Sequence, residues 1–305
     1  MPAFMKPTGQ LQLCGRDKTK HGHFTPLKRG EVKPWLKDQQ EGQDVQVNQL
    51  VHESAYYQVH GQKGKQGQKR STLEEKASSR GMSPMSTALY DPIKAMRNMT
   101  DETIVLFSGG KDSAVTLDLC FRYFKKVQPV FMYMVKGLSF QEKVIQWYEE
   151  KYGVEMIRVP HFELSDFLRY GTFRLDDLSV PIVNTVDIYN YLREITGIYW
   201  ISGGERISDS IVRRAMIKES SSIGEKRGRF YPIAYWNKPQ VMSYVKQHRL
   251  PLSLESRMLG FSFSSLEGKQ LSLIKDIFPD DFEKIKSAFP LAEASIKMEE
   301  FYGHK

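Results

Sequence analysis

The chain has 305 residues, enough for one large domain or for one domain with an appendage. Apolar residues make up 40% of it, sufficient for a core, and its two cysteines, Cys14 and Cys120, exclude a disulfide scaffold. The net charge of +8 is uneven, because residues 1–89 carry 14 Lys/Arg against 8 Asp/Glu. No apolar run approaches 18 residues and no signal-peptide stretch opens the chain, so we expect a cytoplasmic protein without membrane contact.

Residues 1–88 are predicted to form a basic, low-complexity, irregular arm. The segment 61–70 has no apolar side chain and reads as a flexible basic linker. Two short strands are expected before it, at 45–51 and 56–59. The arm is either a solvated tail or a segment for protein assembly or nucleic-acid binding, in which Pro34 and Trp35 would dock on a partner.

Residues 89–305 are predicted to form one domain in which strands and helices alternate. A helix at 91–99 leads into strands at 103–107, 129–135, 154–159 and 198–202 and helices at 112–125, 139–152, 163–169, 184–196 and 207–218. From about residue 237 the chain is helical, with helices at 237–248, 267–277, 280–287 and 291–301. The pattern predicts a doubly wound α/β fold: a mostly parallel sheet with helices on both faces and a helical C-terminal part.

The most informative segment is the turn between the first strand and its helix. It reads Ser108-Gly109-Gly110-Lys111-Asp112-Ser113. Its glycines let backbone N–H groups approach a ligand, and the helix that follows presents the positive end of its dipole. Such a turn suits a phosphate or pyrophosphate. It is not a Walker A loop, because Asp112 stands where Ser or Thr is required after the lysine. The alternative is an ordinary turn in which Asp112 or Ser113 caps the helix.

A strand, SGG-x-DS and a helix resemble the signature of the PP-loop superfamily, the adenine-nucleotide α-hydrolase-like proteins. The superfamily includes ATP pyrophosphatases and phosphoadenosine phosphosulfate (PAPS) reductases, and the likeness to the latter is the stronger. The resemblance implies that Ser108, Gly109, Gly110 and Ser113 hold phosphates or sulfate. Lys111 would add charge, and Asp112 would position Mg²⁺ or cap the helix. The nucleotide would be ATP or PAPS.

Two further turns follow strands of the same sheet. Lys136-Gly137-Leu138-Ser139-Phe140 partly matches a PAPS reductase element near the adenosine, or is a glycine turn with a helix-capping serine. Gly203-Gly204-Glu205-Arg206 resembles the family's Gly-x-Arg-x-x-x-Ser element, completed by Ser210. In this second turn Arg206 either clamps a phosphate or pairs with Glu205 or Asp209.

The resemblance continues at Pro232–Trp236 and at His248-Arg249-Leu250-Pro251 but fails at the family's cysteines. Phe261 and Ser264 stand at the cysteine places, and Cys120 is expected to be buried in the first helix. A thiol-dependent reduction is therefore not expected, nor is an iron–sulfur cluster. A serine hydroxyl does not replace a thiolate easily, because its pKa is far higher.

Two functions remain open. In the first, Lys111, Asp112 and Arg206 catalyse adenylyl or sulfonucleotide chemistry at the phosphates, as in a transferase or an oxidoreductase relative. In the second, a catalytically degenerate nucleotide-binding or structural protein assembles through its arm, and one form of this hypothesis is a phage-encoded virion protein. In either case we expect an adenine nucleotide as ligand and a homo-oligomer.

Overall fold

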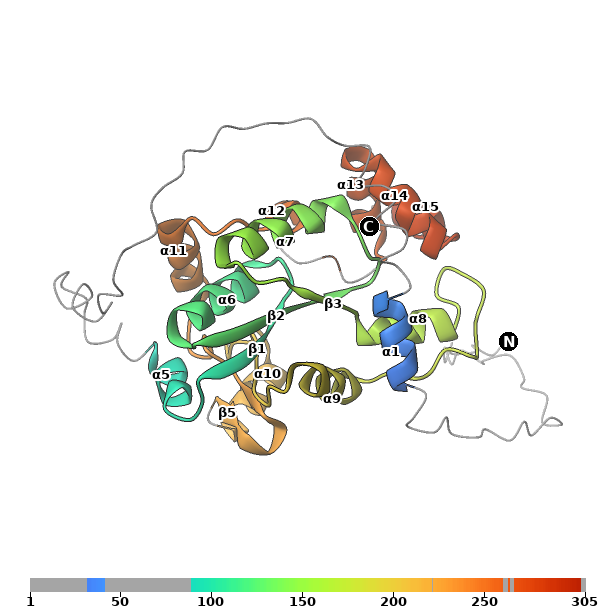
Figure 1. Ribbon diagram of the computed structural model, residues 1–305. Coiled ribbons are helices and arrows are strands. Elements are labelled where there is room, and N and C mark those ends of the chain that lie inside the picture. Colours follow the sequence, from blue (N-terminus) through green and yellow to red (C-terminus); the bar gives the residue numbers. More distant parts are fainter. Residues whose placement is uncertain (1–31, 42–88, 221, 260–262, 264–265, 303–305) are drawn as a thin grey trace, which may run out of the picture.

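The computed structural model describes residues 32–41, 89–220, 222–259, 263 and 266–302, and these build one sheet with helices on both faces (Figure 1). The six strands run in the order β3-β2-β1-β4-β6-β5, and only the β5–β6 pair is antiparallel. The strands are β1 (Glu102–Phe107), β2 (Lys126–Tyr133), β3 (Ile157–Pro160), β4 (Ile201–Ser202), β5 (Ile223–Gly224) and β6 (Arg229–Phe230). The predicted doubly wound α/β fold is confirmed.

The helices divide between the two faces because residues of β1 alternate in direction. Val105 and Phe107 belong to a core shared with α6 (Lys111–Tyr123), α7 (Ser139–Tyr152) and α11 (Lys238–His248), whereas Ile104 packs with α9 (Thr185–Thr196). The other helices are α1 (Val32–Glu41), α5 (Asp91–Arg97), α8 (Phe162–Arg169), α10 (Ile211–Glu219), α12 (Leu254–Leu259), α13 (Gly268–Ile277), α14 (Pro279–Ala288), α15 (Ala292–Tyr302) and the 3-10 turn η3 (Glu225–Arg227). In these described ranges no helix is long and apolar enough to cross a membrane.

The chain reverses its direction of progress across the sheet between β1 and β4. From β1 it steps outward to β2 and β3, and then it crosses back through α8 and α9 to place β4 on the other side of β1. Val105 of β1 is paired with Ser202 of β4, so the carboxyl ends of these two strands lie next to each other. In doubly wound sheets the crevice at such a reversal is where ligands bind.

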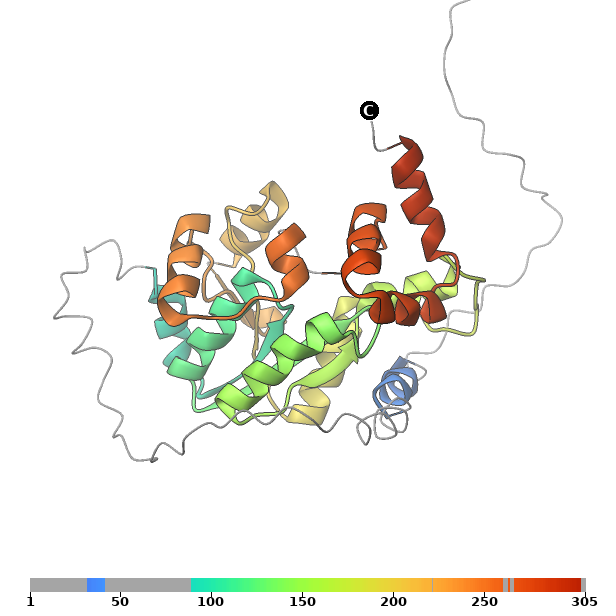
Figure 2. The same ribbon diagram turned by 90° about the horizontal axis from the view of Figure 1, so that it is seen from above.

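The last three helices pack on one another beside the sheet (Figure 2). Gly268, the first residue of α13, lies so close to the backbone carbonyl of Ser295 in α15 that a Cβ there would clash with it. The helical C-terminal part is thereby confirmed in its elements.

One helix of the N-terminal segment packs on the sheet. Leu36 of α1 is fully buried against the β3 and α9 side of the sheet. The Tyr133 hydroxyl donates to the carbonyl of Gln39 (2.9 Å), and Lys136 Nζ donates to that of Gln40 (3.2 Å). The boundary at residue 88 stays a prediction, and the strands and linker predicted at 45–51, 56–59 and 61–70 lie outside the described residues.

Several predicted element boundaries need correction. The strand expected at 198–202 is reduced to Ile201–Ser202, and the helix expected at 207–218 begins at Ile211. It begins late because Ser210 accepts a hydrogen bond from the Arg213 N–H (3.1 Å) and so caps the helix. The helix at α12 and the short strand β6 were not predicted.

Candidate functional site

The first turn is closed by one serine hydroxyl. Ser113 Oγ accepts a hydrogen bond from the Ser108 N–H (3.1 Å) and donates one to the carbonyl of Gly110 (3.0 Å). Gly109 has a φ of +74°, a conformation that a side chain would strain. Gly110 is the N-cap of α6, and no side chain of a described residue caps this end. The alternative in which Asp112 or Ser113 caps the helix is therefore wrong, and the N–H groups of the first helical turn remain directed at the crevice.

The second turn lies directly against the first. A Cβ built on Gly204 would stand 3.0 Å from the carbonyl carbon of Asp112 and 3.1 Å from the nitrogen of Ser113. The two backbones approach this closely only because residue 204 has no side chain. The structure thus brings together the two glycine turns that the sequence predicted separately.

Arg206 and Asp112 join the two turns electrostatically. Arg206 is only 5% exposed, and its Nε lies 3.0 Å from Asp112 Oδ1. The other carboxylate oxygen of Asp112 accepts a hydrogen bond from Lys111 Nζ (2.7 Å). The carboxylate of Asp112 therefore lies between two cations that the sequence analysis assigned to the ligand.

Asp209 is the second partner of Arg206. Its carboxylate accepts hydrogen bonds from Arg206 Nη2 (2.6 Å) and from the Arg206 backbone N–H (2.9 Å). Of the two carboxylates considered as partners in the sequence, Asp209 is engaged and Glu205 is not. The third guanidinium nitrogen, Nη1, is buried and makes no hydrogen bond with any described residue. Nε also makes no hydrogen bond with a described residue, since its contact with Asp112 is an ion pair only, so both nitrogens are buried donors whose hydrogen-bonding capacity is not satisfied.

Glu205 pairs with a different arginine, Arg229, and this ion pair packs against Gly203 of the second turn. Glu205 Oε1 accepts a hydrogen bond from Arg229 Nη2 (2.9 Å), and both groups lie where a Cβ on Gly203 would be. The guanidinium of Arg229 stacks on the rings of Tyr189 and Tyr231. Burial lowers the pKa of Arg229, but the carboxylate of Glu205 more than offsets this, and the pKa is raised above its usual value. A side chain at position 203 would therefore displace the Glu205–Arg229 ion pair.

The remaining two predicted residues have structural partners. Ser210 is the N-cap of α10. Gly137, at φ +73°, follows β2, and its carbonyl accepts a hydrogen bond from Lys284 Nζ of α14 (2.7 Å). Ser139, two residues after Gly137, does not cap α7, because its Oγ donates a hydrogen bond to Asp281 Oδ2 (2.7 Å). The same carboxylate oxygen also accepts a hydrogen bond from the N–H of Phe140 (3.3 Å). The capping role considered for Ser139 is wrong, since a carboxylate from α14 fulfils it.

Ser253 is a part of the site that the sequence analysis missed. Its N–H and its hydroxyl both donate to the carbonyl of Gly109, at 3.1 and 3.3 Å. Its side chain also fills the space where Gly109 would carry a Cβ. The two residues are 144 positions apart, so no local pattern could have revealed the contact.

Glu255, two residues further on, is a deeply buried acid. It is 2% exposed, and neither carboxylate oxygen has a hydrogen-bond partner within the described ranges. Burial raises the pKa of Glu255 to about 7, although the nearby Ser253 hydroxyl opposes the shift. The side chain is consequently protonated, and neutral, over the acidic range.

Cys120 is fully buried in α6, as predicted. Its Sγ lies 3.5 Å from Ser202 Oγ, and burial raises the pKa of the thiol to about 12. It is therefore a neutral thiol at physiological pH, and not a nucleophile. Cys14, Phe261 and Ser264 lie outside the described residues.

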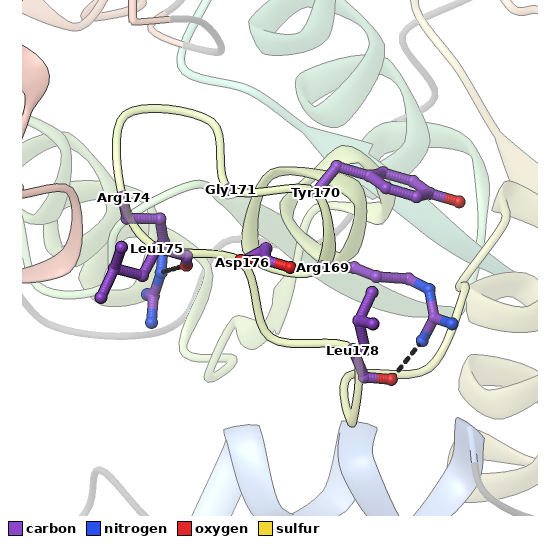
Figure 3. Close-up of a pocket in the computed structure, with 7 residues that line it drawn as sticks. All are labelled: Arg169, Tyr170, Gly171, Arg174, Leu175, Asp176 and Leu178. Atoms are coloured by element: carbon purple, nitrogen blue, oxygen red, sulfur yellow. Dashed lines mark hydrogen bonds between the residues drawn. The ribbon is translucent and has the colours of Figure 1, made fainter. Parts of the chain in front are cut away.

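The surface depressions lie elsewhere. One, of about 270 Å³, is formed by the loop after α8, where Arg169 Nη1 donates to the carbonyl of Leu178 at 2.6 Å (Figure 3). Another lies between the start of α13 and α15. Neither of these two depressions is lined by a residue of the two turns.

The sequence was compared with protein families, curated proteins and solved structures. The family model of the phosphoadenosine phosphosulfate reductase domain matches residues 102–254, which include both glycine turns. No curated protein matches.

Three solved structures illustrate the structural likeness. The U34-tRNA thiolase NcsA from Methanococcus maripaludis with its [4Fe–4S] cluster is 16% identical, over 66% of this chain and 78% of its own, with a TM-score of 0.38. The PAPS reductase from Candida auris, in a phosphate complex, is 13% identical over 66% and 97%, with a TM-score of 0.40. The NH3-dependent NAD synthetase from Campylobacter jejuni is 14% identical over 72% and 96%, with a TM-score of 0.35.

The cofactor prediction, ATP or PAPS with Mg²⁺ and without an iron–sulfur cluster, is corrected by these findings. The matched thiolase carries a [4Fe–4S] cluster, which contradicts the exclusion, and the exclusion is withdrawn. For Mg²⁺, no group of three or more His, Cys, Asp or Glu side chains is placed to hold a metal ion in the part of the chain that the structure describes. The metal-binding role suggested for Asp112 is not carried further, since its carboxylate is engaged by Lys111 and Arg206.

Proposed function

Because this chain belongs to the phosphoadenosine phosphosulfate reductase domain family, we propose that it binds an adenine nucleotide, ATP or PAPS, at its two glycine turns. The nucleotide would lie in the crevice between the ends of β1 and β4. The terminal phosphates or the sulfate would occupy the Ser108–Ser113 turn, and the second turn would close on them from the side.

The observation that carries the proposal is the contact between Gly204 and the start of α6. It places Arg206, with its unpartnered Nη1, beside a helix end that no side chain of the described residues caps. Backbone N–H groups, a helix dipole and a buried guanidinium thus converge on one position, and each of these favours an anion.

We further propose chemistry at the phosphates. Breaking a phosphoanhydride bond places negative charge on the departing group, and Lys111 and Arg206 would neutralise it. Asp112 would act as a positioning residue, because it holds both cations in place before the ligand arrives. Ser113 would keep the turn closed through its bond to Gly110.

Because Cys120, the cysteine among the described residues, is buried, we favour transfer of an adenylyl group or related sulfonucleotide chemistry over reduction by this thiol. Cys120 is fully buried and neutral, so it does not attack a sulfonate. A second candidate is nucleotide binding without turnover, which the burial of Cys120 also supports, since this thiol would not react with a bound sulfonucleotide.

Turnover distinguishes the two candidates. The full chain is incubated with ATP or PAPS, and release of pyrophosphate or of 3′,5′-phosphoadenosine is followed with Arg206→Met beside it. Arg158→Met is the matched control, because Arg158 also pairs with two carboxylates, Glu142 and Glu149, away from the turns. Release that Arg206→Met abolishes and Arg158→Met retains supports the enzyme. Tight binding without release from either nucleotide supports the second candidate.

A further inference from the structure

The outer face of α10 combines positive charge with exposed apolar side chains. Only Ile217 of this helix is buried. Ile211 and Val212 are 82% and 78% exposed, and the cations beside them on α10 are exposed as well. We use the term α10 surface for these exposed residues of α10 and η3: Ile211, Val212, Arg213, Arg214, Lys218, Lys226 and Arg227.

The α10 surface begins at the candidate site. Arg213 Nη1 donates to Asp209 Oδ2 (3.2 Å), and Asp209 is the carboxylate that holds Arg206. At the far end Arg227 lies 3.9 Å from Glu219, the last residue of α10, so η3 continues the same surface. Exposed cations therefore continue from the second glycine turn along α10, over about 13 Å of helix, with Arg214 and Lys218 on the same side of the helix as Ile211 and with Val212 and Arg213 on other sides.

The α10 surface carries a clear excess of one charge. Residues 211–227 contain five Lys/Arg and two Glu, and all seven of these side chains are exposed. A helix face that is merely solvated and stabilised by ion pairs has nearly equal numbers of positive and negative side chains, and its large apolar side chains are buried. This face has neither property, and its composition fits a partner that is both polyanionic and able to contact apolar groups.

We infer that the α10 surface binds a nucleic-acid strand and leads it to the crevice between the two turns. Arginine forks match phosphate groups, and the regular phosphates of a nucleic acid suit cations spaced along a helix. Ile211, on the side of α10 that carries Arg214 and Lys218, would contact the bases. The inference goes beyond the proposed nucleotide site and does not depend on turnover there.

The test measures binding of fluorescein-labelled 20-nucleotide DNA and RNA single strands and a DNA duplex to the full chain by anisotropy, at several salt concentrations. The key variant replaces Arg214, Lys218, Lys226 and Arg227 with Gln. The matched control removes the same charge from the N-terminal arm, by replacing Lys63, Lys65, Lys69 and Arg70 with Gln. Circular dichroism and melting show that each variant is folded.

We expect the α10-surface variant to bind at least about tenfold more weakly near 0.1 M salt. The slope of log K against log[salt] should fall by about 3, since each lost phosphate contact removes about 0.7–0.9. The arm variant should keep most of the affinity. Three results overturn the inference: an unchanged affinity of the α10-surface variant, loss confined to the arm variant, or binding of polyglutamate but of no nucleic acid. Calorimetry with ATP and PAPS, run separately, reports on the proposed nucleotide site alone.

Discussion

Arg206 and Asp112 form an ion pair across the two glycine turns, with Arg206 Nε 3.0 Å from Asp112 Oδ1. The pair connects the loop after β4 to the first turn of α6, two segments that the sheet brings together at the reversal of the chain. Because Arg206 is buried, the contact is shielded from solvent. It explains how the turns keep one arrangement before any ligand is bound.

The first prediction concerns this pair. Arg206→Met removes one of the two cations beside each of Asp112 and Asp209, so the free energy of unfolding should fall by about 1–3 kcal/mol. Urea unfolding of Arg206→Met, Asp112→Asn and the double variant gives their coupling energy. Strictly additive effects would mean that the two side chains do not stabilise each other.

The second prediction concerns the contact between the turns. Gly204→Ala should lower the free energy of unfolding by about 1–3 kcal/mol, because its Cβ meets the rigid backbone of Asp112 and Ser113. Gly224→Ala is the control, since its Cβ would meet nothing nearer than 3.5 Å and its φ is −96°. Thermal melting compares the two, and equal stability of both variants would refute the close approach.

The third prediction concerns pH. The folded-state pKa of Glu255 is raised from 4.5 to about 7, so its stabilising contribution is complete below pH 4.5 and is lost as the pH rises to about 7. The shift corresponds to about 3 kcal/mol. Glu255→Gln, which is neutral throughout, should be more stable than the parent at pH 8 but similar at pH 4.5. Urea unfolding at both pH values checks this, and parallel pH profiles would contradict it.

The fourth prediction concerns Asp118, a buried carboxylate in the middle of α6. Asp118 accepts hydrogen bonds from Arg122, Lys151, Tyr152 and Tyr244. Burial raises the pKa of Asp118, but these bonds, that of Arg122 foremost, hold it well below its usual range.

The contribution of Asp118 is therefore present above pH 4 and is lost as the pH falls below that value. Asp118→Asn should lower the free energy of unfolding by about 3–5 kcal/mol at pH 7, as measured by urea unfolding. If the substitution lowered the free energy of unfolding less at pH 7 than at pH 3, the predicted direction of the pH dependence would be wrong.

The fifth prediction concerns α1. Leu36→Ala should lower the free energy of unfolding by about 2–4 kcal/mol, because this side chain is fully buried against the β3 and α9 side of the sheet. Asp38→Ala, on the exposed side of the same helix, should change it little. If both variants unfold like the parent, α1 does not contribute to the fold.

The parts predicted from the sequence are those with local signals. Helix 139–152 was predicted with its observed limits, and the turn at Ser108–Ser113 is recognisable because its glycines stand between a buried strand and an amphipathic helix. The helix predicted at 237–248 is confirmed at Lys238–His248, and Asn237 caps it through a capping box with Gln240.

The parts that were missed depend on tertiary contacts. Ser253 reaches Gly109 from the other end of the domain, and the partner of Asp112 is fixed by strand order. Strand β6 has only two residues and is defined by its pairing with β4 and β5. A run of two residues is too short to show a hydrophobic periodicity. Helix α1 is defined by the surface on which Leu36 packs, and its sequence alone gave no reason to separate it from the arm.

The most direct test of the nucleotide site is calorimetric titration of the full chain with ATP and with PAPS, with and without a divalent cation. The account predicts saturable binding of at least one of them, at one site per chain, that Gly204→Ala weakens at least about tenfold and Gly224→Ala leaves unchanged. Absence of binding heat for both nucleotides, or equal binding by the two variants, would contradict a nucleotide site at the paired turns.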